Sequence, residues 1–358
     1  MNWSRVKILT AKFATIILAG LIVGHTSPDR AASASLQPED VRIVNSEVAD
    51  VSAGLSGQID PSVITTNYDA LESLATSLRN SKAETSDGTW HLLIFYRLLT
   101  FDRNDPNKPP ETEWQARQKF LKDWISAQPK SITARVALAS FYVNYAWLAR
   151  GTGDASTVSA ADQKLFSHRM GQALQVLVEA EVITNQCPVD FDTMQQIQLS
   201  RGSDPATAKK EFNAANTYEP HYSAFCFNQV NYLLPRSFGD EGDWERFATK
   251  SADALGGDQG DILYARMVWW VNNQHVYDDL FKDTGCSWPR VKNGMSLLIK
   301  RYPDSVSACT EMAYLAFLAS DRETSRSFFL RIGPSMDNSV WANDKAHFLH
   351  VHKWALDE

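Results

Sequence analysis

The stretch LLPRSFGDEGDWERFA, at residues 233–248, decides the fold of this chain. Pro235 is a helix terminator, because proline lacks the N–H group that the next helical hydrogen bond needs. Gly239 and Gly242 permit a tight connection. Trp244 then starts a segment with apolar residues at helical spacing. The stretch therefore predicts two consecutive helices joined by a short turn.

A recurring pattern upstream predicts that such helices form hairpins. Small and large apolar residues spaced by four and three precede a proline in two places: Ala173, Leu177 and Ala180 before Pro188, and Ala208, Phe212 and Ala215 before Pro220. The two prolines are 32 residues apart, close to the 34-residue period of the tetratricopeptide repeat. We therefore expect an all-α fold, a tetratricopeptide-like helical-hairpin repeat solenoid, over residues 61–358.

The remainder of the chain supports helices and no strands. Apolar residues at i, i+3, i+4 and i+7 predict helices over 68–78, 90–98 and 114–127, and a further helix from Pro129 to Gly151. Residues 35–60 are rich in Ser, Ala, Asp and Gly without a sustained period, which predicts a flexible linker.

The N-terminus has the pattern of a secretory signal peptide over residues 1–34. Arg5, Lys7 and Lys12 precede or border the apolar run 13–24, and Ala32-Ser33-Ala34 matches a cleavage site. We expect an exported protein, periplasmic or secreted. Because the cleavage site lies ten residues beyond the apolar run, the alternative is an uncleaved anchor at the inner membrane.

Composition limits the classes of partner. Hydrophobic residues make up 44% and charged residues 22%, as in a globular protein, and the net charge is −7. An acidic protein is repelled by nucleic acid and by anionic lipid. We therefore expect no nucleic-acid partner and no membrane insertion beyond a possible N-terminal anchor.

The sequence contains few signs of a catalytic, cofactor-binding or metal-binding site. The chain has no P-loop, no G-x-G-x-x-G and no G-x-S-x-G, so we expect no cofactor and do not favour an enzyme. His347 and His350 share one helix face and are weak metal candidates, without an H-E-x-x-H motif. The cysteines could form disulfides in an exported protein, with the pairing open, or be buried apolar residues: Cys187, Cys226, Cys286 and Cys309.

Residues 185–357 resemble a bacterial tetratricopeptide-like family known only as a domain of unknown function. The resemblance rests on a Leu-Pro-Arg-aromatic-Gly signature near Pro235, on Gly260–Arg266, and on Tyr302-Pro303-Asp304-Ser305 before the last hairpin. Ser237 departs from the signature, where an aromatic residue is expected. The family has no established activity, so the resemblance implies no catalytic residues.

The best functional candidates are side chains that could bind a protein or peptide. Tyr222, Tyr264 and Trp270 lie on helices expected to line the groove of a solenoid, as does Tyr142. Arg236 either binds the free carbonyls of a helix end or grips a carboxylate of a partner. The leading hypothesis is a peptide- or protein-binding scaffold in the cell envelope. The alternatives are a periplasmic hydrolase or metal-dependent enzyme with a non-standard site, and a structural envelope component.

Overall fold

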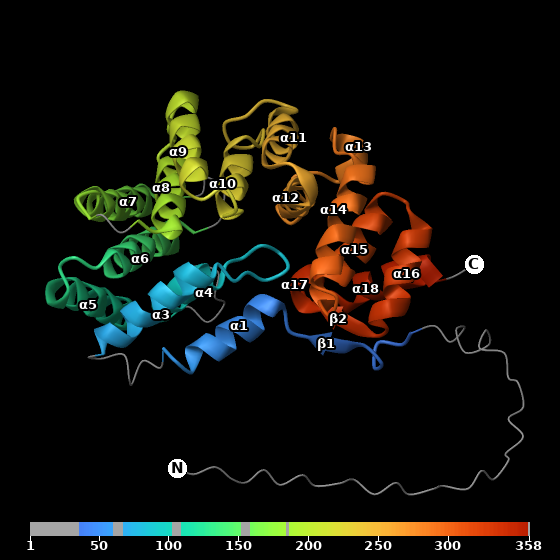
Figure 1. Cartoon of the computed structure of the whole chain (residues 1–358), viewed down its shortest axis with the longest axis horizontal. Helices are drawn as coiled ribbons and strands as arrows, with labels where there is room; N and C mark the ends of the chain where they lie inside the picture. The colour runs from blue at the N-terminus through green and yellow to red at the C-terminus, as the bar shows by residue number, and fades with distance from the viewer. Residues whose placement is uncertain (1–35, 60–66, 102–108, 152–157, 184–185, 357–358) are drawn as a thin grey trace, which may run out of the picture. The chain divides into compact units, whose positions relative to one another are not determined.

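The computed structural model describes residues 36–59, 67–101, 109–151, 158–183 and 186–356, and the predicted signal peptide lies outside them. The described residues are mostly helical, with two short strands, which confirms the all-α prediction (Figure 1).

The first part of the chain forms one strand and eight helices among the residues described. They are β1 (Arg42–Val44), α1 (Glu47–Ser56), α3 (Tyr68–Ser81), α4 (His91–Leu99), α5 (Glu111–Ala127), α6 (Ile132–Arg150), α7 (Ala160–Ala180), α8 (Pro188–Ser200) and α9 (Pro205–Tyr218).

The second part of the chain is also mostly helical and contains one short strand near its C-terminal end. Its elements are α10 (Ala224–Tyr232), α11 (Asp243–Leu255), α12 (Gly257–Asn272), α13 (Leu280–Asp283), α14 (Trp288–Arg301), α15 (Val306–Leu318), α16 (Arg322–Ile332), β2 (Ser335–Asp337), α17 (Asn338–Trp341) and α18 (Lys345–Leu356).

Helix boundaries follow from side chains that satisfy the free N–H groups of a first turn. The Ser131 hydroxyl accepts from the Ala134 N–H at 2.8 Å at the start of α6. Asp204 and Ser305 cap α9 and α15 in the same way, and Pro205 occupies the first position of α9. Gly151, with φ of 69°, ends α6 as the sequence predicts.

Helices that follow one another in the chain pack against one another. The contacting pairs include α5 with α6, α6 with α7, α8 with α9, α11 with α12, α12 with α14, and α15 with α16. Their buried faces form two apolar clusters, one mainly from α3–α9 and one mainly from α11–α18. Helix α10 joins them, because Phe225 belongs to the first cluster while Cys226 and Phe227 belong to the second.

The connection between α10 and α11 spans residues 233–242 and approaches itself closely at Gly239. Helix α10 ends at Tyr232, before Pro235, and α11 starts at Asp243. A Cβ added at Gly239 would lie 2.0 Å from the carbonyl oxygen of Leu233, so no other residue fits without a backbone shift. Gly242 has φ of +81°, a conformation that favours glycine.

The prediction of a flexible linker over 35–60 is wrong for residues 36–59. Strand β1 pairs in parallel with β2, with Arg42 opposite Ser335 and Val44 opposite Asp337. Helix α1 packs against α4. Both elements depend on partners far away in the sequence, so local composition did not indicate them.

Across the described ranges, no helix combines the length and the apolar character needed to cross a membrane.

Candidate functional site

Two of the predicted binding residues lie inside the core. Tyr222 and Tyr264 are each 2% exposed. The Tyr222 ring packs edge-on against Trp90 with centroids 5.0 Å apart, and the Tyr264 hydroxyl accepts from the Ser287 N–H at 3.0 Å. Trp270 is half-buried and stacks on Phe227. The tyrosines therefore stabilise the fold and cannot anchor a partner.

Arg236 is held by the chain itself. Its guanidinium donates to the backbone oxygen of Gln274 at 3.0 Å and to the Gln274 side-chain oxygen at 2.9 Å. Gln274 lies two residues beyond the end of α12. Arg236 therefore binds a backbone carbonyl just beyond a helix end, which is one of the two roles that the sequence analysis considered for it.

The histidine and cysteine candidates do not form a metal site or a bridge. Within the described part of the chain, no group of three His, Cys, Asp or Glu residues could hold a metal ion. The His347 ring packs against Tyr314 and Trp341. All four cysteines are free thiols, and Cys187, Cys226 and Cys309 are buried.

Two of these thiols are poor nucleophiles. Burial raises the pKa of Cys226 and of Cys286 to about 12. The thiolate is the reactive form, and it is scarce at neutral pH when the pKa is that high. The environment of these two cysteines therefore suits a structural role.

A groove of about 710 Å³ runs between α5 and α7 and has α6 as its floor. Floor residues Arg135, Leu138 and Tyr142 share one face of α6, at i, i+3 and i+7. Leu138 and Tyr142 are only 4% and 3% exposed, so neighbouring side chains cover most of their surface. The volume falls in the range of ligand pockets, roughly 300–1,000 Å³.

The walls of the groove come from the neighbouring helices. Helix α5 contributes Lys122, Ile125 and Ser126. Helix α7 contributes a row of mostly polar side chains: Ser167, His168, Gly171, Gln172, Gln175, Val176 and Glu179. Helices α5, α6 and α7 are consecutive in the chain and lie together in Figure 1. The groove is therefore a product of three successive helices, as expected for helical hairpins.

Gly171 is an unusual residue on this wall. It lies in the interior of the 21-residue helix α7, where glycine costs roughly 0.5–1 kcal/mol relative to alanine. A Cβ added there would meet nothing within 4 Å, so packing inside the protein does not require a glycine. Its effect is to leave space in the groove.

The charges of the groove differ from those of the whole chain. Lys122, Arg135 and His168 line it together with one acid, Glu179. Neither Lys122 nor Arg135 has a carboxylate within 4.0 Å among the described residues. Glu179 instead accepts a hydrogen bond from Gln175 at 2.8 Å. The lining of the groove therefore has more basic than acidic side chains, although the protein as a whole is acidic.

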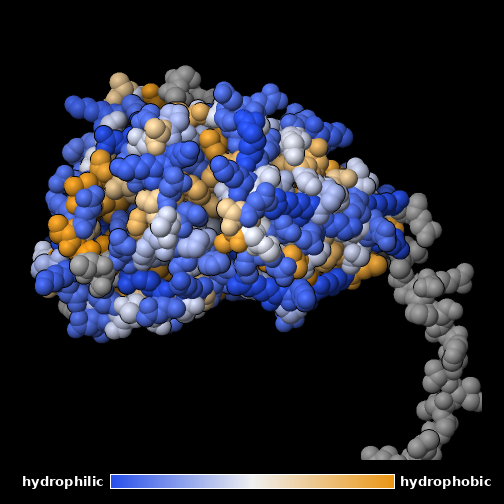
Figure 2. Space-filling view, turned by 45° about the horizontal axis from the view of Figure 1, so that its top comes forward, coloured by the Kyte–Doolittle hydropathy of each residue, from blue (hydrophilic) through white to orange (hydrophobic). Residues whose placement is uncertain are grey.

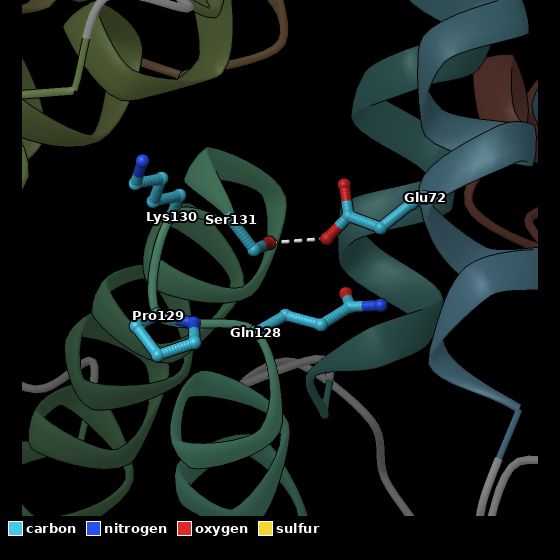
Figure 3. A pocket seen from close by; sticks show the side chains of 5 residues that line it. All are labelled: Glu72, Gln128, Pro129, Lys130 and Ser131. Carbon is cyan, nitrogen blue, oxygen red and sulfur yellow. Dashed lines mark hydrogen bonds between the residues drawn. The ribbon is translucent and has the colours of Figure 1, made fainter.

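A second hollow of about 440 Å³, shown in Figure 3, has a structural explanation. The Ser131 hydroxyl donates to the Glu72 carboxylate, and the Thr133 hydroxyl donates to the other Glu72 oxygen at 2.8 Å. Gln128 donates to Asp69 at 2.6 Å. These bonds tie α3 to the start of α6, so Glu72, Gln128 and Ser131 of this hollow are already hydrogen-bonded within the protein.

A buried polar junction was missed by sequence reasoning. Glu47 of α1 accepts from the Ser86 N–H at 2.7 Å and from the hydroxyls of Ser86 and Ser305. Arg266 of α12 donates to the Ser86 carbonyl oxygen at 3.0 Å and pairs with Glu84 at 3.2 Å. We call these five residues the junction cluster. The sequence carried a signal, because Arg266 is a lone charge within the apolar run 262–271.

Comparison of the chain with protein-family models, with curated proteins and with solved structures finds no match.

Proposed function

We propose that this protein is a tetratricopeptide-like helical-repeat scaffold that binds a segment of another protein in the groove between α5 and α7. The observation that carries the proposal is the groove itself, with Arg135, Leu138 and Tyr142 on its floor, polar walls and a wall glycine that internal packing does not require. Repeat proteins bind extended partners on surfaces of this kind, between successive helices.

The remaining surface gives little support to a broad apolar interface. On the face shown in Figure 2, hydrophilic residues predominate and apolar residues form separate patches. Exposed large apolar residues in the described ranges are scattered over several elements, for example Ile43, Val182 and Leu330. A narrow groove that binds a short segment suits this surface better than a flat docking face.

Site-specific photo-cross-linking in cells tests this function. A photo-reactive phenylalanine analogue is placed at Gln175, on the wall of the groove, in the full chain. The matched control carries it at Gly54, an exposed glycine of α1 that lies outside the groove. We expect a defined cross-linked protein with Gln175 and none with Gly54. Identical products at both positions, or none at either, would contradict the proposal.

We also propose that the protein is exported and acts in the cell envelope, as a member of the tetratricopeptide-like family that residues 185–357 resemble. The N-terminal pattern of basic residues, apolar run and Ala32-Ser33-Ala34 supports export. Fractionation followed by N-terminal sequencing tests it. A periplasmic or secreted chain that starts at Ser35 is expected, whereas a cytoplasmic chain with its N-terminus intact would contradict export.

A further inference from the structure

We propose that the segment bound in the groove is acidic: one of its Asp or Glu side chains pairs with Arg135, and an apolar side chain lies over Leu138 and Tyr142 near Gly171. This inference rests on the proposed binding function and names the chemical class of the partner.

The first step is the state of Arg135. It is partly exposed on α6, and its guanidinium donates a long hydrogen bond, 3.3 Å, to the Ser131 carbonyl oxygen. A guanidinium has five N–H donors arranged to bind a carboxylate with two parallel hydrogen bonds. Arg135 therefore has further N–H donors that could bind a carboxylate at the floor of the groove.

The second step compares Arg135 with other cations of this chain. Arg266 pairs with Glu84 at 3.2 Å, Arg290 with Asp261 at 2.9 Å, and Lys292 with Asp321 at 2.9 Å. In a chain with 42 acids and 35 basic residues, intramolecular partners are plentiful. Arg135 is partly buried and has no carboxylate partner among the residues that the structure describes, so an external carboxylate would be stabilised there.

The third step concerns the apolar part of the segment. Arg135 and Tyr142 are seven residues apart, which corresponds to roughly 10 Å along a helix that rises about 1.5 Å per residue. An extended peptide covers that distance in about three residues, at roughly 3.3 Å each. The expected pattern is therefore an acidic residue and an apolar residue about three positions apart.

The fourth step chooses a peptide over another anion. A nucleic acid is a dense polyanion, and the net charge of −7 repels it. A short peptide with one or two carboxylates gains the local attraction of Arg135 and Lys122 without that general repulsion. Glu179, at the wall, disfavours additional acids in the same segment.

Display selection with the full chain tests the inference. A library of random twelve-residue peptides is selected on the wild-type chain, and peptides that still bind Gly171→Phe are discarded, so that only groove-specific sequences remain. We expect these to be enriched in Asp or Glu about three residues from an apolar residue. Their affinity should fall about tenfold or more in Arg135→Gln, because a charge-assisted pair is lost. Lys209→Gln, on the exposed surface of α9, changes the net charge equally and should leave affinity unchanged.

The outcomes separate the two proposals. Groove-specific peptides without acidic enrichment, bound equally by Arg135→Gln, would overturn the acidic partner and keep the binding function. A selection that yields no groove-specific peptide would contradict both. Melting curves of each variant show whether the fold is retained, and an equal loss of affinity in Lys209→Gln would attribute the effect to net charge and overturn the role of Arg135.

Discussion

At the residue scale, two charges buried in apolar helices have different environments. Arg266 has its charge matched by Glu84 within the junction cluster. Glu311 is the lone charge of α15 and is 5% exposed. Burial raises the pKa of the Glu311 carboxyl well above its usual value, and the nearby acids Asp87 and Asp337 raise it further. A carboxyl of this kind holds its proton to a higher pH than an ordinary glutamic acid does.

Glu311→Gln should therefore change how stability depends on pH. Because the folded pKa of Glu311 is higher than its unfolded value of 4.5, its contribution to stability is fully present below pH 4.5 and is lost as pH rises toward the folded pKa. Glutamine has no such penalty, so the variant should gain stability relative to the wild type from pH 4 to pH 8. Urea unfolding across that range measures this, and two parallel curves would show that Glu311 is not perturbed.

Arg236→Ala distinguishes bracing from ligand binding. The side chain is exposed and makes two hydrogen bonds to Gln274, so its loss should lower the free energy of unfolding by roughly 0.5–1.5 kcal/mol. Partner binding in the α5–α7 groove should not change. An unchanged melting temperature combined with weaker partner binding would instead assign Arg236 to a binding site.

At the element scale, two glycines should respond to alanine in opposite directions. Gly171→Ala should raise the free energy of unfolding by about 0.4–1 kcal/mol, because the helix interior favours alanine and the added methyl group meets nothing within 4 Å. Gly239→Ala should destabilise the protein, because its Cβ would lie 2.0 Å from the Leu233 oxygen. Denaturant titration of both variants tests the contrast, and destabilisation by Gly171→Ala would mean that the groove wall is misplaced.

Helix positions were predictable from local signals. Apolar spacing over 68–78 and 114–127 corresponds to α3 and α5, and Gly151 ends α6 as expected. Each of these helices has an apolar face and a cap or breaker of its own, so the sequence contains the information that forms it. This confirms the all-α character of the described residues, whereas the solenoid type stays a proposal.

The spacing of apolar residues did not predict the groove, nor that Tyr222 and Tyr264 are buried in the core. Periodicity shows which side of a helix is apolar, but it does not show which neighbouring helix covers that side. Tyr222 is covered by Trp90, a residue 132 positions away, and it therefore belongs to the core. Tyr142, another aromatic candidate, lines the groove, where its hydroxyl accepts from Gln118 at 2.9 Å.

At the scale of the whole molecule, residues 36–59 connect parts of the chain that are far apart in sequence. Strand β1 pairs with β2, and Arg42 donates to the Ser335 hydroxyl at 2.7 Å. Glu47 contacts Ser86 ahead of α4 and Ser305 at the start of α15. The segment that composition marked as a linker thus joins the first and the second apolar cluster.

Glu47→Ala tests this connection. Removal of the carboxylate leaves the Ser86 N–H and two hydroxyls without their charged acceptor, so the free energy of unfolding should fall by about 2–3 kcal/mol. Glu39→Ala, an exposed acid before β1, is the matched control and should change stability by less than about 0.5 kcal/mol. An equally small effect of Glu47→Ala would show that the junction cluster does not hold the segment.

The central claim is that the groove between α5 and α7 binds a segment of a partner protein. The most direct measurement is calorimetric titration of the cross-linked partner, once purified, against the wild type and two matched variants. Gly171→Phe fills the groove, whereas Gly54→Phe places the same side chain at an exposed position of helix α1. We predict that Gly171→Phe weakens binding by about tenfold or more without lowering the melting temperature, and that Gly54→Phe binds as the wild type does. Equal affinity of the wild type and Gly171→Phe would contradict the account.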